Sequence, residues 1–99
     1  MTKGERKSSF PKLGPGNVAL VRCDVNTGIV LTTSEEQYMQ TGDIYETFDS
    51  LEAVELFISI ALPNKPNIEF VVYDHHNNPI LTWNRFEKRQ LKDKQFLPR

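Results

Sequence analysis

Two stretches of the chain are rich in apolar and β-branched residues, and each is interrupted by a short run of turn-forming residues. The first begins with the apolar, β-branched run VALVRCD at residues 18–24 and returns as IVLTT at residues 29–33. β-branched residues favour strands, and the intervening VNTG supplies the residue types of a short hairpin loop. The pattern therefore predicts a first β-hairpin over residues 18–33.

A second hairpin is predicted over residues 68–83, where IEFVVYDHHNNPILTW has a polar loop at residues 74–78. Residues 67–83, laid without gaps on residues 17–33, repeat five of 17 positions: Asn17/Asn67, Val21/Val71, Asp24/Asp74, Leu31/Leu81 and Thr32/Thr82. Two interpretations remain open. Any two amphipathic hairpins look alike, or the hairpins form a pseudo-symmetric pair that flanks one helix.

The clearest helix signal is DSLEAVELFISIALP at residues 49–63. Asp49 or Ser50 is suited to cap the first amides, and Pro63 ends the helix. At about 100° per residue, one apolar stripe is predicted to face a sheet; it comprises Leu51, Val54, Phe57, Ile58, Ala61 and Leu62. Leu56 and Ile60 fall outside that stripe, so we expect a terminal arm, a second copy or a partner to cover them.

These elements predict an α+β fold, with one central helix on one face of an antiparallel sheet of four to five strands. The strand order along the chain is β-β-(β)-α-β-β, in which IYETF at residues 44–48 is the third strand. Residues 1–16 are predicted to be a flexible basic arm, residues 17–83 the single domain, and residues 84–99 a basic tail that is partly helical or disordered. Good helix formers from Arg85 to Lys94 predict a short terminal helix within that tail.

Length and composition restrict the possible classes of protein. A chain of 99 residues makes one modest core. The single cysteine, Cys23, excludes an internal disulfide framework and a cysteine-rich zinc site. The sequence has no secretory signal and no apolar run long enough to cross a bilayer, which predicts a cytoplasmic protein.

The net charge of −1 hides a segregated pattern. Residues 23–83 hold ten acidic residues against one basic residue, Lys65, whereas residues 1–22 and residues 84–99 each carry a net charge of +4. Such asymmetry concerns partners and association. It directs attention to residues 35–55, which hold seven acids and no base.

We therefore predict a non-catalytic protein-binding domain, such as an adaptor, subunit or inhibitor-like protein, that engages a basic partner surface and needs no cofactor. The predicted acidic patch consists of Glu35, Glu36, Asp43, Glu46, Asp49, Glu52 and Glu55. Its predicted apolar anchors are Tyr38, Met39, Ile44 and Tyr45. Leu56 and Ile60 are the candidates for self-association in a homodimer.

The sequence offers weak signals for catalysis. Asp24, Asp74, His75 and His76 have the residue types of a metal-dependent hydrolase, the most distant alternative, but aspartate at the start of a turn is favoured simply as an acceptor for loop amides. Cys23 would need His75 or His76 as a base, yet it lies in an apolar run where cysteine is usually a small buried residue. We predict no metal site and no enzyme activity.

The second alternative is a nucleic-acid-associated accessory protein that uses its basic ends. The C-terminal segment combines phosphate-neutralising cations with aromatic rings on which bases stack. These residues are Arg85, Phe86, Lys88, Arg89, Lys92, Lys94 and Phe96. An acidic middle would repel the same backbone, which makes nucleic acid the less favoured partner.

Overall fold

The computed structural model describes residues 9–91 of the chain. Within them, one α-helix and one 3-10 helix accompany an antiparallel sheet of six strands, which confirms the predicted α+β class. The elements in chain order are β1 (Val18–Asp24), β2 (Val30–Leu31), β3 (Glu46–Phe48), α1 (Leu51–Ala61), η2 (Leu62–Asn64), β4 (Ile68–Tyr73), β5 (Pro79–Trp83) and β6 (Lys88–Gln90).

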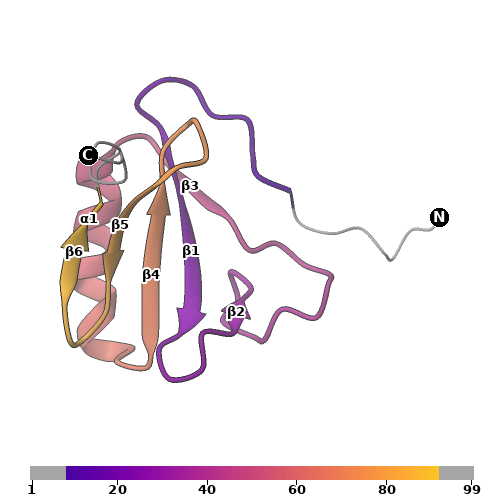
Figure 1. Cartoon of the computed structure of the whole chain (residues 1–99), viewed down its shortest axis with the longest axis vertical. Helices are drawn as coiled ribbons and strands as arrows, with labels where there is room; N and C mark the ends of the chain where they lie inside the picture. The colour runs from indigo at the N-terminus through magenta and orange to yellow at the C-terminus, as the bar shows by residue number, and fades with distance from the viewer. Residues whose placement is uncertain (1–8, 92–99) are drawn as a thin grey trace, which may run out of the picture.

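Strand β1 lies inside the sheet and is paired along both of its sides (Figure 1). On one side it pairs with β4, and β5 and β6 follow outward. On its other side β3 pairs with the first half of β1, with Leu20 opposite Glu46, and β2 pairs with its second half, with Arg22 opposite Leu31. The two outer regions of the sheet are thus β6 and the β2–β3 segment.

Within the two predicted hairpins, β1 pairs with β2 and β4 pairs with β5. Val21 of β1 pairs with Val71 of β4, and these two residues are 50 positions apart in the sequence. The pair Arg22 and Leu31 in the first hairpin corresponds, 50 residues later, to the observed pair Val72 and Leu81 in the second. A shift in register follows Val72, so the second turn is shorter. The shared register favours the pseudo-symmetric interpretation of the repeat.

Helix α1 covers one face of the sheet, and Ser50 caps it as predicted. The Ser50 Oγ accepts a hydrogen bond from the Ala53 amide at 3.0 Å. Val54 and Ile58 are fully buried against the sheet, and each such side chain contributes about 1.5–3 kcal/mol through burial. The core is completed by apolar residues from three strands and from η2, just after the helix: Val18, Leu20, Leu62, Ile68, Phe70, Val72 and Leu81.

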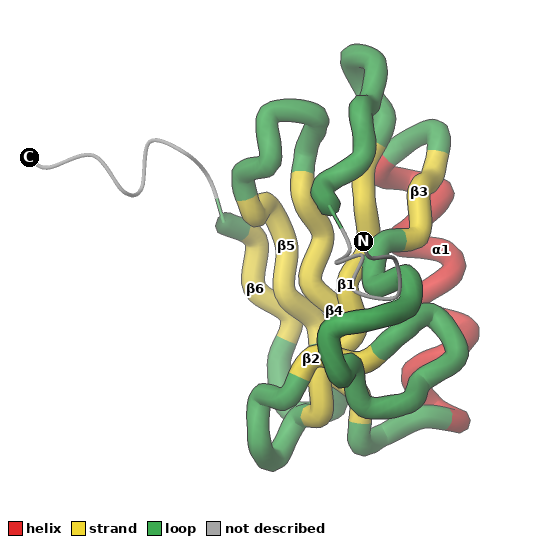
Figure 2. The backbone as a smooth tube through the Cα atoms, turned by 90° about the vertical axis from the view of Figure 1, so that its right-hand side faces the viewer, coloured by secondary structure: helices red, strands yellow, loops and turns green. Residues whose placement is uncertain are grey.

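Loops cover much of the second face of the sheet (Figure 2). Ala19 and Val21 point to this face and are buried. Phe10 packs edge-on against Tyr45 and Tyr73, at centroid distances of 5.3 and 6.2 Å. The described part of the predicted N-terminal arm therefore includes a residue that is packed onto the domain.

Two details differ from the sequence-based expectations. The sheet has six strands, because residues 88–90 form β6 where a helix was predicted; residues 92–94 of that predicted helix lie outside the described residues. The Asn84 Oδ1 accepts hydrogen bonds from the amides of Phe86 and Glu87, and this turn sends the chain back along β5. Leu51, predicted to face the core, is 37% exposed because it is the first residue of α1.

Candidate protein-binding surface

Residues 32–43, which we call the acidic loop, form a closed loop after β2. The Thr32 amide donates to the Glu36 carbonyl at 2.7 Å, and the Thr33 amide donates to the Asp43 carbonyl at 2.8 Å. Two non-glycine residues, Glu35 and Gln40, have left-handed φ angles of 68° and 80°. Such backbone conformations are sparsely populated and are retained where the surroundings fix them.

The acidic loop encloses an open, polar cavity of about 420 Å³. Its lining residues are Thr32, Thr33, Ser34, Glu36, Gln37, Met39, Thr41, Gly42 and Asp43. Glu36 and Asp43 are exposed, and Met39 is 68% exposed. The fold thus presents two carboxylates and an unburied apolar side chain around one concavity.

Three of the seven predicted patch carboxylates have cationic partners among residues 9–91. The pairs are Glu46 with Arg22 at 2.6 Å, Glu35 with Lys65 at 2.9 Å, and Glu55 with Lys88 at 4.0 Å. All three pairs link residues that are far apart in the sequence. Their charges are therefore partly balanced before any partner arrives.

The Arg22–Glu46 pair belongs to the packing between the helix and the sheet. Arg22 is only 4% exposed, and its guanidinium lies 5.5 Å from the Phe57 ring centroid and 6.0 Å from that of Phe70. Its Nε and Nη1 have no hydrogen-bond partner among the residues that the structure describes. Glu46 supplies the compensating charge that this buried cation requires.

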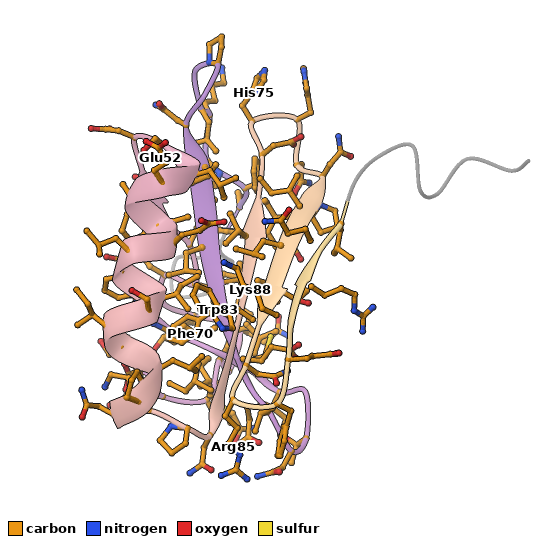
Figure 3. All side chains as sticks on the ribbon, turned by 90° about the vertical axis from the view of Figure 1, so that its left-hand side faces the viewer. Glu52, Phe70, His75, Trp83, Arg85 and Lys88 are labelled. Atoms are coloured by element: carbon orange, nitrogen blue, oxygen red, sulfur yellow. The ribbon has the colours of Figure 1, made fainter. Side chains whose placement is uncertain are left out.

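The remaining predicted residues occupy several settings. Asp49 and Glu52 are exposed at the start of α1, where the helix dipole favours negative charge (Figure 3). Tyr38, Ile44 and Tyr45 are half-buried, and the Tyr45 ring packs against Phe10. Leu56 and Ile60 are 62% and 64% exposed on the outer side of α1.

The two aspartates of the repeat act in turns, as predicted. The Asp24 Oδ1 accepts from the amides of Asn26 and Thr27, and the Asp74 Oδ1 accepts from those of His76 and Asn78. The antiparallel register sets Asp24 opposite the first residue of β4, whereas Asp74 follows the last. They therefore lie at opposite ends of the sheet, and residues 9–91 contain no group of three or more His, Cys, Asp or Glu that could hold a metal ion.

Cys23 is half-buried and pairs across the sheet with Glu69, near the start of β4. Burial raises the pKa of its thiol above the ordinary value of 9.0, and the nearby Glu69 carboxylate adds to the shift. His75 follows the far end of β4, more than ~10 Å along the strand from Glu69. Cys23 is thus a protonated thiol at neutral pH, away from both histidines.

A second concavity was missed by the sequence analysis. This pocket of about 340 Å³ lies beside the end of α1 and is lined by Ser59, Leu62, Pro63, Pro66, Trp83 and Arg85. The Lys88 Nζ lies 4.2 Å from the Trp83 ring centroid. No local pattern marks this pocket, because Pro66 and Trp83 are 17 positions apart and their proximity depends on tertiary packing.

Three comparisons with known proteins were without a match. No family model matches the chain, and neither the curated proteins nor the solved structures include a match. Across the described residues, α1 and η2 are both too short to span a bilayer as an apolar helix.

Proposed function

We propose that the chain is a non-catalytic protein-binding domain whose acidic loop engages a basic surface of another protein. One observation carries the proposal: Glu36 and Asp43 flank the 68%-exposed Met39 around one cavity, and neither carboxylate has an ion pair among residues 9–91. Protein interfaces typically have an apolar core surrounded by a polar rim, and an exposed apolar side chain between unpaired charges fits that arrangement.

The two kinds of side chain have different roles in this proposal. The carboxylates accelerate encounter with a cationic partner and set its orientation, an effect that falls as salt screens the charges. Met39 supplies the apolar area whose burial holds the complex together, and its flexible thioether adapts to the partner surface.

The internal ion pairs rank the residues of the predicted patch. Glu36 and Asp43 are the primary contacts, and Asp49 and Glu52 extend the acidic surface at the start of α1. Glu46 has its main role in the fold because it compensates Arg22. A charge reversal at Glu46 would therefore destabilise the fold, and a loss of binding in that variant could not be assigned to the binding surface.

The proposal is tested by affinity capture from cell lysate at low salt, with quantitative mass spectrometry. The wild-type chain is compared with a Glu36→Lys/Asp43→Lys variant and a Met39→Asp variant. We expect one basic protein to be recovered in near-equal amount with wild type, released at high salt, and lost with either variant.

A matched control is Glu87→Lys, which changes the same kind of charge on a side chain that is 53% exposed in the turn between β5 and β6. This control should retain the partner. Equal capture by wild type and the Glu36→Lys/Asp43→Lys variant, with both folded by circular dichroism, would contradict the proposal.

Self-association through Leu56 and Ile60 is a separate part of the proposal, because both side chains are exposed on α1. Light scattering of the pure protein over a concentration series measures it. A homodimer that a Leu56→Glu/Ile60→Glu variant converts to monomer would support this contact, and a wild-type monomer at every concentration would exclude it.

A further inference from the structure

We propose that the pocket beside Trp83 binds an acidic peptide segment of another protein, which inserts one apolar side chain and places flanking carboxylates near the cationic rim. We call this site the Trp83 pocket; its lining is Ser59, Leu62, Pro63, Pro66, Trp83 and Arg85. It lies at the end of the sheet that carries Arg85, opposite the end where Glu52 lies in the first turn of α1 (Figure 3). The inference is independent of the acidic loop and goes beyond it.

The floor of the Trp83 pocket is apolar and fixed by the fold. Leu62 follows α1 as the first residue of η2 and is 9% exposed, and Pro63 is the next residue of η2. Hydrogen bonds from the Lys65 amide to the Leu62 carbonyl, and from the Ile68 amide to the Lys65 carbonyl, hold the segment that carries both prolines. Proline has no amide proton and a restricted φ angle, so this wall is apolar and preorganised.

The rim of the Trp83 pocket is cationic. Arg85 is exposed, and its guanidinium lies 4.7 Å from the Phe86 ring centroid with no ion pair among the described residues. Lys88 lies over the Trp83 ring and pairs with Glu55 at 4.0 Å. An apolar floor with the Arg85 cation at its edge is complementary to an apolar side chain flanked by carboxylates.

The size of the pocket favours a peptide side chain as the occupant. A cavity of about 340 Å³ that opens to solvent is at the lower end of the range for sites that enclose a whole ligand. A single leucine-sized group fits into it, while the rest of an extended segment lies across the rim. The adjacent edge strand β6 carries Lys88 and Arg89, which disfavour strand addition, so side-chain insertion carries the recognition.

The test uses the full chain and a fluorescein-labelled peptide, acetyl-Glu-Glu-Leu-Glu-Glu-amide, whose binding is followed by fluorescence polarisation. Trp83 is the only tryptophan in the chain, so its emission reports occupancy of this pocket directly. We expect saturable polarisation together with a saturable change in Trp83 emission at the same peptide concentration. Peptides with Ala in place of Leu, or with Gln in place of Glu, should each bind about tenfold more weakly.

Two variants and one matched control locate the site. Arg85→Glu should weaken binding about tenfold, and Ser59→Phe should abolish it by filling the pocket from an exposed helix position. Arg89→Glu makes the same charge change on a neighbouring exposed side chain that does not line the pocket, and it should keep wild-type affinity within a factor of about two.

Four results would overturn the inference. They are equal binding of the Gln peptide, an equal loss with Arg89→Glu and Arg85→Glu, displacement of the peptide by a single-stranded oligothymidylate, and an Arg85-dependent self-association that blocks the pocket. The third result would assign the site to nucleic acid, and the fourth to a second copy of this chain. Because the acidic loop is unchanged in every variant, capture of a basic partner remains a separate readout.

Discussion

The first hairpin and the second hairpin share a register but differ in what they bury and in the charge of the segments that follow. Arg22 of β1 corresponds to Val72 of β4, so a cation occupies in one half the position that an aliphatic side chain fills in the other. Arg22 needs Glu46 as a partner, whereas Val72 needs only apolar neighbours. The same scaffold therefore tolerates a buried charge only where β3 brings a carboxylate beside it.

The return segments show the same contrast at the surface. The Tyr38 amide donates to the Val30 carbonyl, and the Leu91 amide donates to the carbonyl of the equivalent Ile80. After each hairpin, the following segment thus returns to form a backbone hydrogen bond with the second strand of that hairpin, at equivalent positions. In the first half this segment is acidic and carries Met39; in the second it is basic and lies beside Trp83. One scaffold displays opposite charge at its two outer regions.

The largest effect on stability is expected when an arginine is placed at the equivalent position of the second hairpin. Val72→Arg buries a cation with no carboxylate partner at a position that is 0% exposed. We expect a loss of more than about 3 kcal/mol in the free energy of unfolding, measured by urea denaturation. Thr47→Arg, on an exposed position of β3, is the control and should change stability by less than about 0.5 kcal/mol. Wild-type stability of Val72→Arg would show that the two halves do not differ in this way.

Removing the carboxylate in the first half should have the next largest effect. Glu46→Gln leaves the Arg22 guanidinium buried without a counter-charge, and because the Glu46 side chain is 40% exposed we expect a loss of about 2 kcal/mol in unfolding free energy. An Arg22→Met/Glu46→Gln double variant, which makes the first half resemble the second, should recover most of that loss. A double variant as unstable as Glu46→Gln would mean that the ion pair is not the cause.

The two turn aspartates should be equivalent to each other. Asp24→Ala and Asp74→Ala each remove two hydrogen bonds to loop amides, and each should lower the unfolding free energy by about 1 kcal/mol. The Asn variants keep an acceptor oxygen and serve as matched controls in thermal unfolding. A silent change at one aspartate and a large one at the other would break the proposed equivalence.

The smallest effect concerns alkaline pH. The folded state raises the pKa of Cys23 above 9.0 and that of Tyr73 above 10.0, in each case mainly because burial disfavours the anion. The unfolded chain therefore loses these protons first, so their contribution to stability is present below pH 9 and declines as pH rises above it. Unfolding free energies measured between neutral and alkaline pH should fall less steeply for Cys23→Ala. An equally steep decline in the Cys23→Ala variant would show that Cys23 does not contribute to the pH dependence of stability.

Local signals in the sequence predicted the parts of the fold that depend on neighbouring residues. Ser50 capping α1, the turn roles of Asp24 and Asp74, and the two hairpins follow from side chains a few positions apart. Strand β6 was not predicted, because the helix-forming residues after Arg85 outweighed the turn that Asn84 makes. Here a turn set by one side chain overrides helix propensity.

Contacts between distant residues could not be read from periodicity. Arg22 and Glu46 are 24 positions apart, and Glu35 and Lys65 are 30 apart, so the sequence analysis assigned both glutamates to the acidic patch without their cationic partners. The Trp83 pocket likewise combines the end of α1 with β5. The sequence therefore could not show which carboxylates of the predicted acidic patch are already paired with cations of the same chain.

The central claim is that the acidic loop is the surface that binds a basic partner. The most direct measurement is an amide NMR titration of the full chain with acetyl-Lys-Lys-Leu-Lys-Lys-amide at low salt. The account predicts saturable, salt-sensitive shifts centred on residues 32–43, absent in the Glu36→Lys/Asp43→Lys variant. Shifts that are centred elsewhere, or that persist unchanged in that variant, would contradict it.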